Sequence, residues 1–129
     1  MKVCLDTSVI IDHLRSFSPA TALIEDLIQR EAELHSSTVV RTEVLAGMRP
    51  REERRTRLFL DLVEWHPVDL PASEGAGALG REHLPANNGI DTPDLLLAEL
   101  ARRLGAEMLT TNEKHFREMV PGLRAPYAY

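Results

Sequence analysis

The chain alternates, from one end to the other, between short apolar runs of strand length and longer segments with helical periodicity. Strands are expected at 2–6, 33–36, 65–70 and 106–111, and more weakly at 123–127. Helices are expected at 7–15, from Pro19, at 38–46, at 51–64, from Pro71, at 93–104 and at 114–119. Strands alternating with helices predict an α/β layered domain, with a mostly parallel central sheet of about four to five strands flanked by helices.

Residues that start and stop helices support these boundaries. Thr7 or Ser8 is the expected N-cap of the first helix. Thr92 is the expected cap of the helix at 93–104, with Pro93 in its first position. The sequence NNG at 87–89 is typical of a loop.

Length and charge limit the classes of function that are open to the chain. Its 129 residues are the size of one domain, 1–129. The net charge of −5 means that the surface as a whole does not attract nucleic acid, so any role there needs a local basic patch or a bound cation. With a single cysteine, Cys4, no internal disulfide forms, which suits a reducing cytoplasm. No secretory signal or transmembrane run is visible, so no membrane role is expected.

Acidic and amide side chains stand where strands end and a helix begins. Asp6 ends the first strand, Asp94 lies in the first turn of the helix at 93–104, and Asn112 follows the strand at 106–111. Ligands bind outside the carboxyl ends of parallel strands, so these side chains are expected at one edge of the sheet. Each also has a purely structural interpretation, as a helix cap, a helix-dipole partner and a turn residue respectively.

Glu43 is a fourth candidate, on the helix at 38–46. It shares a helical face with Val39, Val40 and Gly47, at steps of three and four residues, which predicts an acid on a core-facing stripe. It either joins the other acids or pairs with a buried arginine, Arg41 or Arg49.

Clustered carboxylates need a counter-charge, because like charges a few ångströms apart raise one another's pKa. A hard divalent cation supplies it, since Mg²⁺ prefers a few carboxylates, several waters and phosphate oxygens. Such an ion activates water and stabilises charge on a phosphodiester.

Three stretches of the sequence carry a family resemblance. LDTSVIIDHL, TVVRTEVLAG and DTPDLLLAELARRLGAEMLTTNEKHF, in that order and spacing, resemble the motifs of PIN-domain ribonucleases, and in particular of VapC-type toxins from type II toxin–antitoxin pairs. The likeness covers nearly the whole chain. It implies a three-layer PIN fold.

The resemblance implies roles for individual residues. Asp6, Glu43 and Asp94 would form the acidic core that binds Mg²⁺ or Mn²⁺, with Asn112 completing the catalytic set where many relatives place a fourth aspartate. Asp91 would add a further carboxylate, or is a loop residue. The hydroxyl groups of three residues would assist: Thr7, Ser8 and Thr110.

The resemblance also implies an activity and partners. The expected activity is a metal-dependent endoribonuclease that cuts structured cellular RNA, such as tRNA or rRNA, and so inhibits translation. The expected partners are a VapB-like antitoxin and a second copy of the chain, in a heterotetramer or a larger complex. Arg51, Arg54, Arg55 and Arg57 could contact RNA, or form a solvated helix face paired with Glu52 and Glu53.

Other functions fit the sequence less well. A response-regulator receiver domain also combines an α/β sheet with acids and Mg²⁺, but its phosphorylated aspartate would here be Asp69, two residues from a proline on either side. A haloacid-dehalogenase-like phosphatase requires D-x-D, where this chain has DTS. A metal-free partner-binding module remains open. The five histidines are scattered, and only His115 is close to a motif.

Overall fold

A four-stranded parallel sheet organises the protein, as the alternating pattern predicts. The computed structural model describes residues 1–85 and 89–129. Strands β1 (Lys2–Leu5), β2 (Glu33–Ser37), β3 (Glu64–His66) and β4 (Glu107–Leu109) lie in the order β3-β2-β1-β4. All three strand pairings are parallel. The central strand β1 is therefore fully buried along Val3, Cys4 and Leu5.

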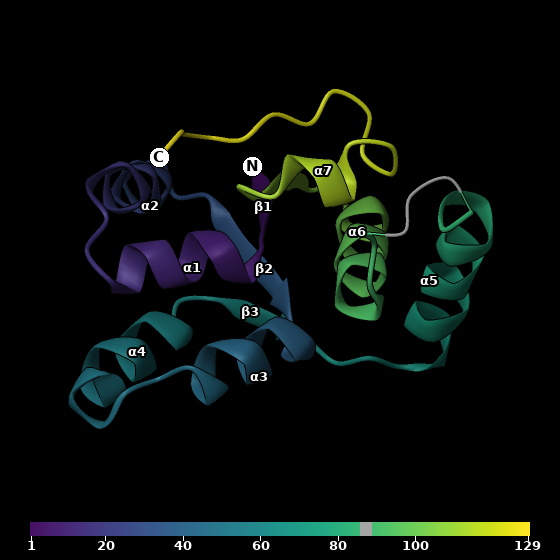
Figure 1. Ribbon diagram of the computed structural model, residues 1–129. Coiled ribbons are helices and arrows are strands. Elements are labelled where there is room, and N and C mark those ends of the chain that lie inside the picture. The colour runs from purple at the N-terminus through teal and green to yellow at the C-terminus, as the bar shows by residue number, and fades with distance from the viewer. Residues whose placement is uncertain (86–88) are drawn as a thin grey trace.

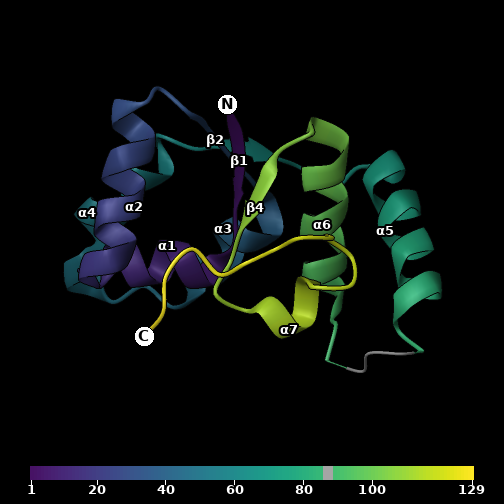
Figure 2. The same cartoon turned by 90° about the horizontal axis from the view of Figure 1, so that it is seen from above.

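Helices cover both faces of the sheet and give three layers. Helices α5 (Leu70–His83) and α6 (Thr92–Leu104) lie on one side, and α1 (Thr7–Leu14) and α2 (Ser18–Gln29) on the other (Figures 1 and 2). The remaining helical elements are α3 (Thr38–Ala46), the 3₁₀ turn η1 (Pro50–Glu52), α4 (Glu53–Leu60) and α7 (Glu113–Phe116). This is the α/β architecture expected from the sequence.

The hydrophobic core lies between these layers and fixes the strand ends. From α1 it takes Val9 and Ile10, and from α6 Leu97 and Leu100. Phe116 of α7 is also fully buried, which anchors the segment after β4. Burial of each such side chain stabilises the fold by about 1.5–3 kcal/mol. None of the helices in residues 1–85 and 89–129 is both long and apolar enough to cross a bilayer.

The N-caps of α1 and α6 are both aspartates. The N-cap of α1 is Asp6, which confirms its structural interpretation as a helix cap, rather than Thr7 or Ser8; the N-cap of α6 is Asp91 rather than the expected Thr92. In both cases the aspartate one residue upstream has extended backbone geometry, so its carboxylate reaches the first turn of N–H groups.

The segment around β3 is shorter and more interrupted than expected. The helix expected at 51–64 divides into η1 and α4, and strand β3 begins already at Glu64. The strand expected at 65–70 ends at His66 because Pro67 has no N–H to continue the ladder. Asp69 instead caps α5, accepting the Ala72 N–H at 2.9 Å.

The last expected strand, at 123–127, is wrong. The segment carries no strand and runs back over the sheet edge toward α1 (Figure 2). The hydroxyls of Tyr127 and Tyr129 both donate to Asp12 Oδ2, at 2.7 and 2.6 Å. Both rings also pack against Phe17. The loop expected at 87–89 lies partly outside the described residues.

Candidate active site

A pocket of about 180 Å³ opens at the carboxyl end of the sheet. The residues that line it are Asp6, Thr7, Ser8, Glu43, Asp91, Pro93, Asp94, Asn112 and His115. They come from the loop after β1 and the start of α1, from α3, from the start of α6 and from the segment after β4. The four principal candidates, Asp6, Glu43, Asp94 and Asn112, are thus brought together from distant parts of the chain.

Asp6 is both a helix cap and a wall of the pocket. Its Oδ1 accepts the Thr7 N–H at 2.8 Å, and its Oδ2 accepts the Thr110 hydroxyl at 2.6 Å and the Ser8 hydroxyl at 3.5 Å. Burial raises the pKa of Asp6, and these hydrogen bonds oppose the rise by favouring the carboxylate. Thr110 lies behind the pocket and holds Asp6 in place. Asp6 therefore caps α1 and also lines the pocket.

Asp94 is the most deeply buried acid of the pocket, with 8% of its surface exposed. It forms a capping box with Asp91: the Asp94 N–H donates to Asp91 Oδ1 at 3.1 Å, and the Asp91 N–H donates to Asp94 Oδ2 at 3.3 Å. Burial raises the pKa of Asp94 to about 6, with the charge of Asp91 adding to the rise. Asp91 is thus a cap residue whose carboxylate also belongs to the pocket.

Glu43 does not lie on a core-facing stripe, which corrects the sequence prediction. Its side chain is exposed, whereas Val40 and Val44 form the buried stripe of α3. The Thr7 hydroxyl donates to Glu43 Oε1 at 2.9 Å. Across the described parts of the chain, Glu43 forms no ion pair with an arginine, and Arg41 lies over the Trp65 ring instead.

His115 is a pocket residue whose role the sequence left open. Its Nδ1 lies 3.0 Å from Asp94 Oδ2 and 2.9 Å from Asn112 Nδ2. Asn112 and His115 are three residues apart at the start of α7, and residues at this spacing in a helix lie side by side. The sequence could therefore have indicated this neighbour of Asn112 once a helix was predicted there. His115 is the one basic side chain among the residues lining the pocket.

The donor set suits a hard divalent cation. Four carboxylates, from Asp6, Glu43, Asp91 and Asp94, face a small space, and the charge of Asp91 raises the pKa of both Asp6 and Asp94. Within the described residues, these carboxylates are not drawn closely enough together for three of them to ligate one ion directly. Mg²⁺ and Mn²⁺ tolerate this spacing, because Mg²⁺ keeps several waters and takes only one or two carboxylates.

The predicted RNA-binding arginines lie outside this pocket. Arg51 and Arg55 line a separate basic hollow of about 380 Å³ together with Arg15 and Arg49. Arg55 also donates to Ser16 Oγ at 3.2 Å. Arg54 lines neither hollow. Arg57 pairs with Glu53 at 3.8 Å on the exposed face of α4, which is the solvated arrangement considered for this stretch.

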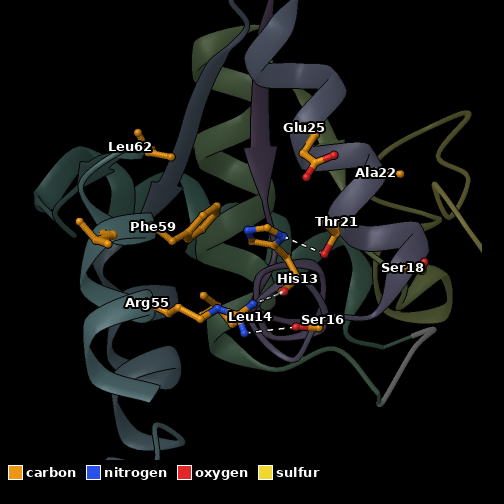
Figure 3. Close-up of a pocket in the computed structure, with 11 residues that line it drawn as sticks. His13, Leu14, Ser16, Ser18, Thr21, Ala22, Glu25, Arg55, Phe59 and Leu62 are labelled. Carbon is orange, nitrogen blue, oxygen red and sulfur yellow. Dashed lines mark hydrogen bonds between the residues drawn. The ribbon is translucent and has the colours of Figure 1, made fainter. Parts of the chain in front are cut away.

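A larger, more apolar hollow of about 680 Å³ lies between α4 and the α1–α2 pair (Figure 3). His13 stands in its centre, with Nδ1 3.2 Å from Thr21 Oγ1 and its ring 5.1 Å from that of Phe59. Leu58 and Leu62 of the α4 segment line it while 60% and 55% exposed. This α1–α2–α4 groove contains no carboxylate cluster.

Comparison with known proteins decides the family. The model of the PIN domain family matches residues 3–120. This chain belongs to the PIN-domain family. The PIN domain is 37% identical over 123 residues to ribonuclease VapC19 of Mycobacterium tuberculosis, in strains CDC 1551 / Oshkosh and H37Rv, which covers 95% of this chain and 98% of the relative. This chain is therefore a PIN domain of the VapC type.

Solved structures share the fold of this PIN domain. A toxin–antitoxin complex from Klebsiella pneumoniae superposes with a TM-score of 0.80 at 24% identity, over 98% of this chain and 99% of that chain. VapBC2 from Rickettsia felis, bound to a DNA fragment from their promoter, gives a TM-score of 0.77 at 22% identity over 97% of both chains. At these identities the likeness establishes the PIN fold alone.

Proposed function

We propose that this PIN domain, acting as the single domain 1–129, is a divalent-metal-dependent endoribonuclease and the toxin of a toxin–antitoxin pair. The observation that supports this most directly is the convergence of Asp6, Glu43, Asp91 and Asp94 on one pocket. The ribonuclease name of the 37% identical relative agrees with that chemistry.

We assign a different role to each pocket residue around a bound Mg²⁺ or Mn²⁺ ion. Asp6 and Asp94 would hold the ion, and Glu43, which the sequence suggested could bind it directly or through water, would bind it through water because the three carboxylates do not meet closely enough for direct ligation. When bound, the ion activates water and counters negative charge on the phosphate oxygens. The exposed carboxylate of Glu43 orients the attacking water, and Asn112, beside His115, completes the catalytic set.

The hydroxyl groups around Asp6 and Glu43 position these acids. Thr110 and Ser8 donate to Asp6 Oδ2, which fixes the direction in which this carboxylate faces. Thr7 donates to Glu43 and links the start of α1 to α3. The three predicted accessory hydroxyls therefore act as positioning groups.

RNA would reach the acids along α1. Asp6 caps the first turn of this helix, and Arg15 of the basic hollow follows its last residue, so the two sites are about 12 Å apart along an eight-residue helix. Arg51 and Arg55 add positive charge to that hollow, which suits an RNA backbone. The substrate we propose is structured cellular RNA of the tRNA or rRNA class, cut in the cytoplasm so that translation stops.

An antitoxin would neutralise the enzyme. The K. pneumoniae and R. felis structures are described as a toxin–antitoxin complex and as VapBC2, which supports a VapB-like partner. We propose in addition that the chain forms homodimers that assemble with this antitoxin. The exposed leucines of the α1–α2–α4 groove, Leu58 and Leu62, provide an apolar surface for a segment of that partner.

The test of the activity removes one charge at a time from the pocket. Asp6→Asn and Asp94→Asn should each lower cleavage of total RNA in Mg²⁺ by at least about 100-fold, because each removes a carboxylate of the metal site. Newly formed 5′ ends measure cleavage, and circular dichroism checks the fold. Asp26→Asn, which removes an exposed carboxylate paired with Arg30, should cleave normally. Full activity in both pocket variants would refute the proposal.

Direct measurements can distinguish two other possible functions from a ribonuclease. A receiver-like domain should be labelled by acetyl phosphate, whereas a nuclease should not. A metal-free binding module should show no Mn²⁺ binding by calorimetry, and no difference between the native chain and Asp94→Asn.

A further inference from the structure

A second cluster of metal-ligating side chains lies on the neighbouring strands β2 and β3, and none of its members lines the acidic pocket. His35 is on β2, and Glu64 and His66 are on the edge strand β3. The strand register pairs His35 with Glu64 and Ser37 with His66, so the three side chains share one face. One ligand atom from each lies within 4.8 Å of the other two. Among the described residues this is the one group so closely placed.

The distances between these atoms are close to those of a tetrahedral metal site. His35 Nδ1 lies 2.9 Å from His66 Nε2 and 3.4 Å from Glu64 Oε2. Zinc bonds of about 2.0–2.1 Å at tetrahedral angles separate neighbouring ligand atoms by roughly 3.4 Å. An ion would therefore require only a small opening of the histidine pair.

The ring nitrogen of His35 that faces away from His66 is hydrogen-bonded to a carboxylate, as the second nitrogen of metal-binding histidines commonly is. Its Nε2 lies 3.1 Å from Glu33 Oε1, and a carboxylate can only accept, so Nε2 carries the proton. Nδ1 then carries no proton and accepts the hydrogen bond from His66 Nε2, and a bound ion would take the place of that shared proton. Such a carboxylate fixes the ring and raises its basicity as a ligand. Because only 2% of His35 is exposed, the ring is also held by packing.

We propose that His35, Glu64 and His66 bind one Zn²⁺ ion, with water as the fourth ligand and Glu33 orienting His35. Two imidazoles and one carboxylate favour Zn²⁺ over Mg²⁺, which prefers oxygen ligands alone. The ion would join the three-residue edge strand β3 to β2 and so hold that edge of the sheet, and none of its ligands lines the acidic pocket. The proposal does not depend on the nuclease activity.

Zinc titration of the full-length, metal-stripped protein tests this site. Calorimetry should show one Zn²⁺ bound per chain in the presence of excess Mg²⁺, and Co²⁺ should give the intense visible absorption of a tetrahedral site. His66→Gln should weaken this binding by at least about 100-fold, and Glu33→Gln by about 10-fold, since it removes the carboxylate that orients the ring. Zn²⁺ should raise the melting temperature of the native chain and leave that of His66→Gln unchanged.

Matched variants show whether the site is the one proposed. His83→Gln changes a histidine that lies 3.8 Å from Glu82, and it should bind zinc normally. Asp94→Asn should also bind normally, which separates this site from the acidic pocket. If His66→Gln does not fold, Glu64→Gln, which changes an exposed side chain, replaces it. Unchanged zinc binding in the His66 or Glu64 variant overturns the proposal, as does loss of the bound zinc in Asp94→Asn.

Discussion

Single residues of the acidic pocket each serve the fold and the site together. Asp6 caps α1 with one oxygen and accepts the Thr110 hydroxyl with the other, while Asp94 closes a capping box and stays mostly buried. The same hydrogen bonds that start the helices therefore aim the carboxylates. This explains why local sequence patterns for helix caps and for ligands coincide at these positions.

Thr110 tests this coupling at the residue scale. Thr110→Val keeps the shape but leaves Asp6 Oδ2 and the Asn112 N–H without the hydroxyl that each contacts, at 2.6 and 3.0 Å. We expect a loss of about 1.5–3 kcal/mol in the free energy of unfolding, because one of these bonds is to a carboxylate. Thr110→Ser keeps the hydroxyl and should lose much less. Denaturant unfolding in EDTA measures both, and equal stabilities would contradict the coupling.

The raised pKa of Asp94 predicts an opposite pH dependence with and without metal. Its pKa moves from the ordinary value of 3.8 to about 6 in the folded protein, so the folded state binds more protons between these values. Without metal, this group's contribution to stability should fall as pH rises through that window. Mn²⁺ binds the ionised form, so its stabilisation should grow over the same range.

Melting temperatures with and without Mn²⁺, at about pH 5 and about pH 7.5, measure this effect. The difference caused by Mn²⁺ should be larger at the higher pH. In Asp94→Asn the pH dependence of that difference should shrink. A metal effect that is equal at both pH values would show that Asp94 does not titrate with the ion.

At the scale of elements, the position of α6 depends on how closely α5 packs against it. Glu99 of α6 is 1% exposed and pairs with Arg102, and its carboxyl group lies directly against Gly75 of α5. A Cβ atom at Gly75 would overlap that carboxyl group, whereas a Cβ at Gly77 would meet open space. Asp94 lies in the first turn of α6, so this contact supports the pocket from a distance.

The two glycines provide a matched pair of variants. Gly77→Ala should stabilise the protein by about 0.8–1 kcal/mol through helix propensity. Gly75→Ala gains the same propensity but forces Glu99 to move, and we expect a net loss of about 1–3 kcal/mol. Thermal unfolding of both variants checks this. If Gly75→Ala were stabilised as much as Gly77→Ala, α5 and α6 could not pack as closely as described.

Element boundaries show where sequence reasoning reaches its limit. Pro67 ended β3 earlier than the apolar pattern indicated, because a missing N–H outweighs side-chain preference in a ladder. The segment at 123–127 has strand-like residues, but a hydrogen bond from Tyr127 to Asp12 holds it away from the sheet. The first case was readable from the sequence and the second was not, because Asp12 is more than a hundred residues away.

At the scale of the whole molecule, three of the hollows among the described residues differ in chemistry: an acidic pocket, a basic hollow and the apolar α1–α2–α4 groove. The basic hollow and the groove share Leu14, Ser16 and Arg55, so they adjoin. A partner segment in the groove would therefore lie beside the proposed path of RNA.

Because the groove lies outside the acidic pocket, substitutions in it should change antitoxin binding without changing RNA cleavage. Leu58→Asp and Leu62→Asp should weaken antitoxin binding by at least about 10-fold, equal to about 1.4 kcal/mol, because a charge replaces apolar contact area. RNA cleavage by the free toxin should be unchanged. Leu70→Asp, at an 80% exposed position on α5, is the matched control and should bind normally. Binding is measured by calorimetry with the purified antitoxin, and equal affinities would remove the groove as the docking surface.

The sequence by itself determined the order of strands and helices, the parallel sheet and the convergence of Asp6, Asp94 and Asn112. These follow from short-range periodicity and from the rule that parallel strands end at one edge. Only the tertiary structure decided that Glu43 faces outward, that His115 contacts Asp94, and that His35 meets His66. Those contacts depend on helix rotation and on strand register, which are set by packing between segments far apart in the chain and leave no local pattern.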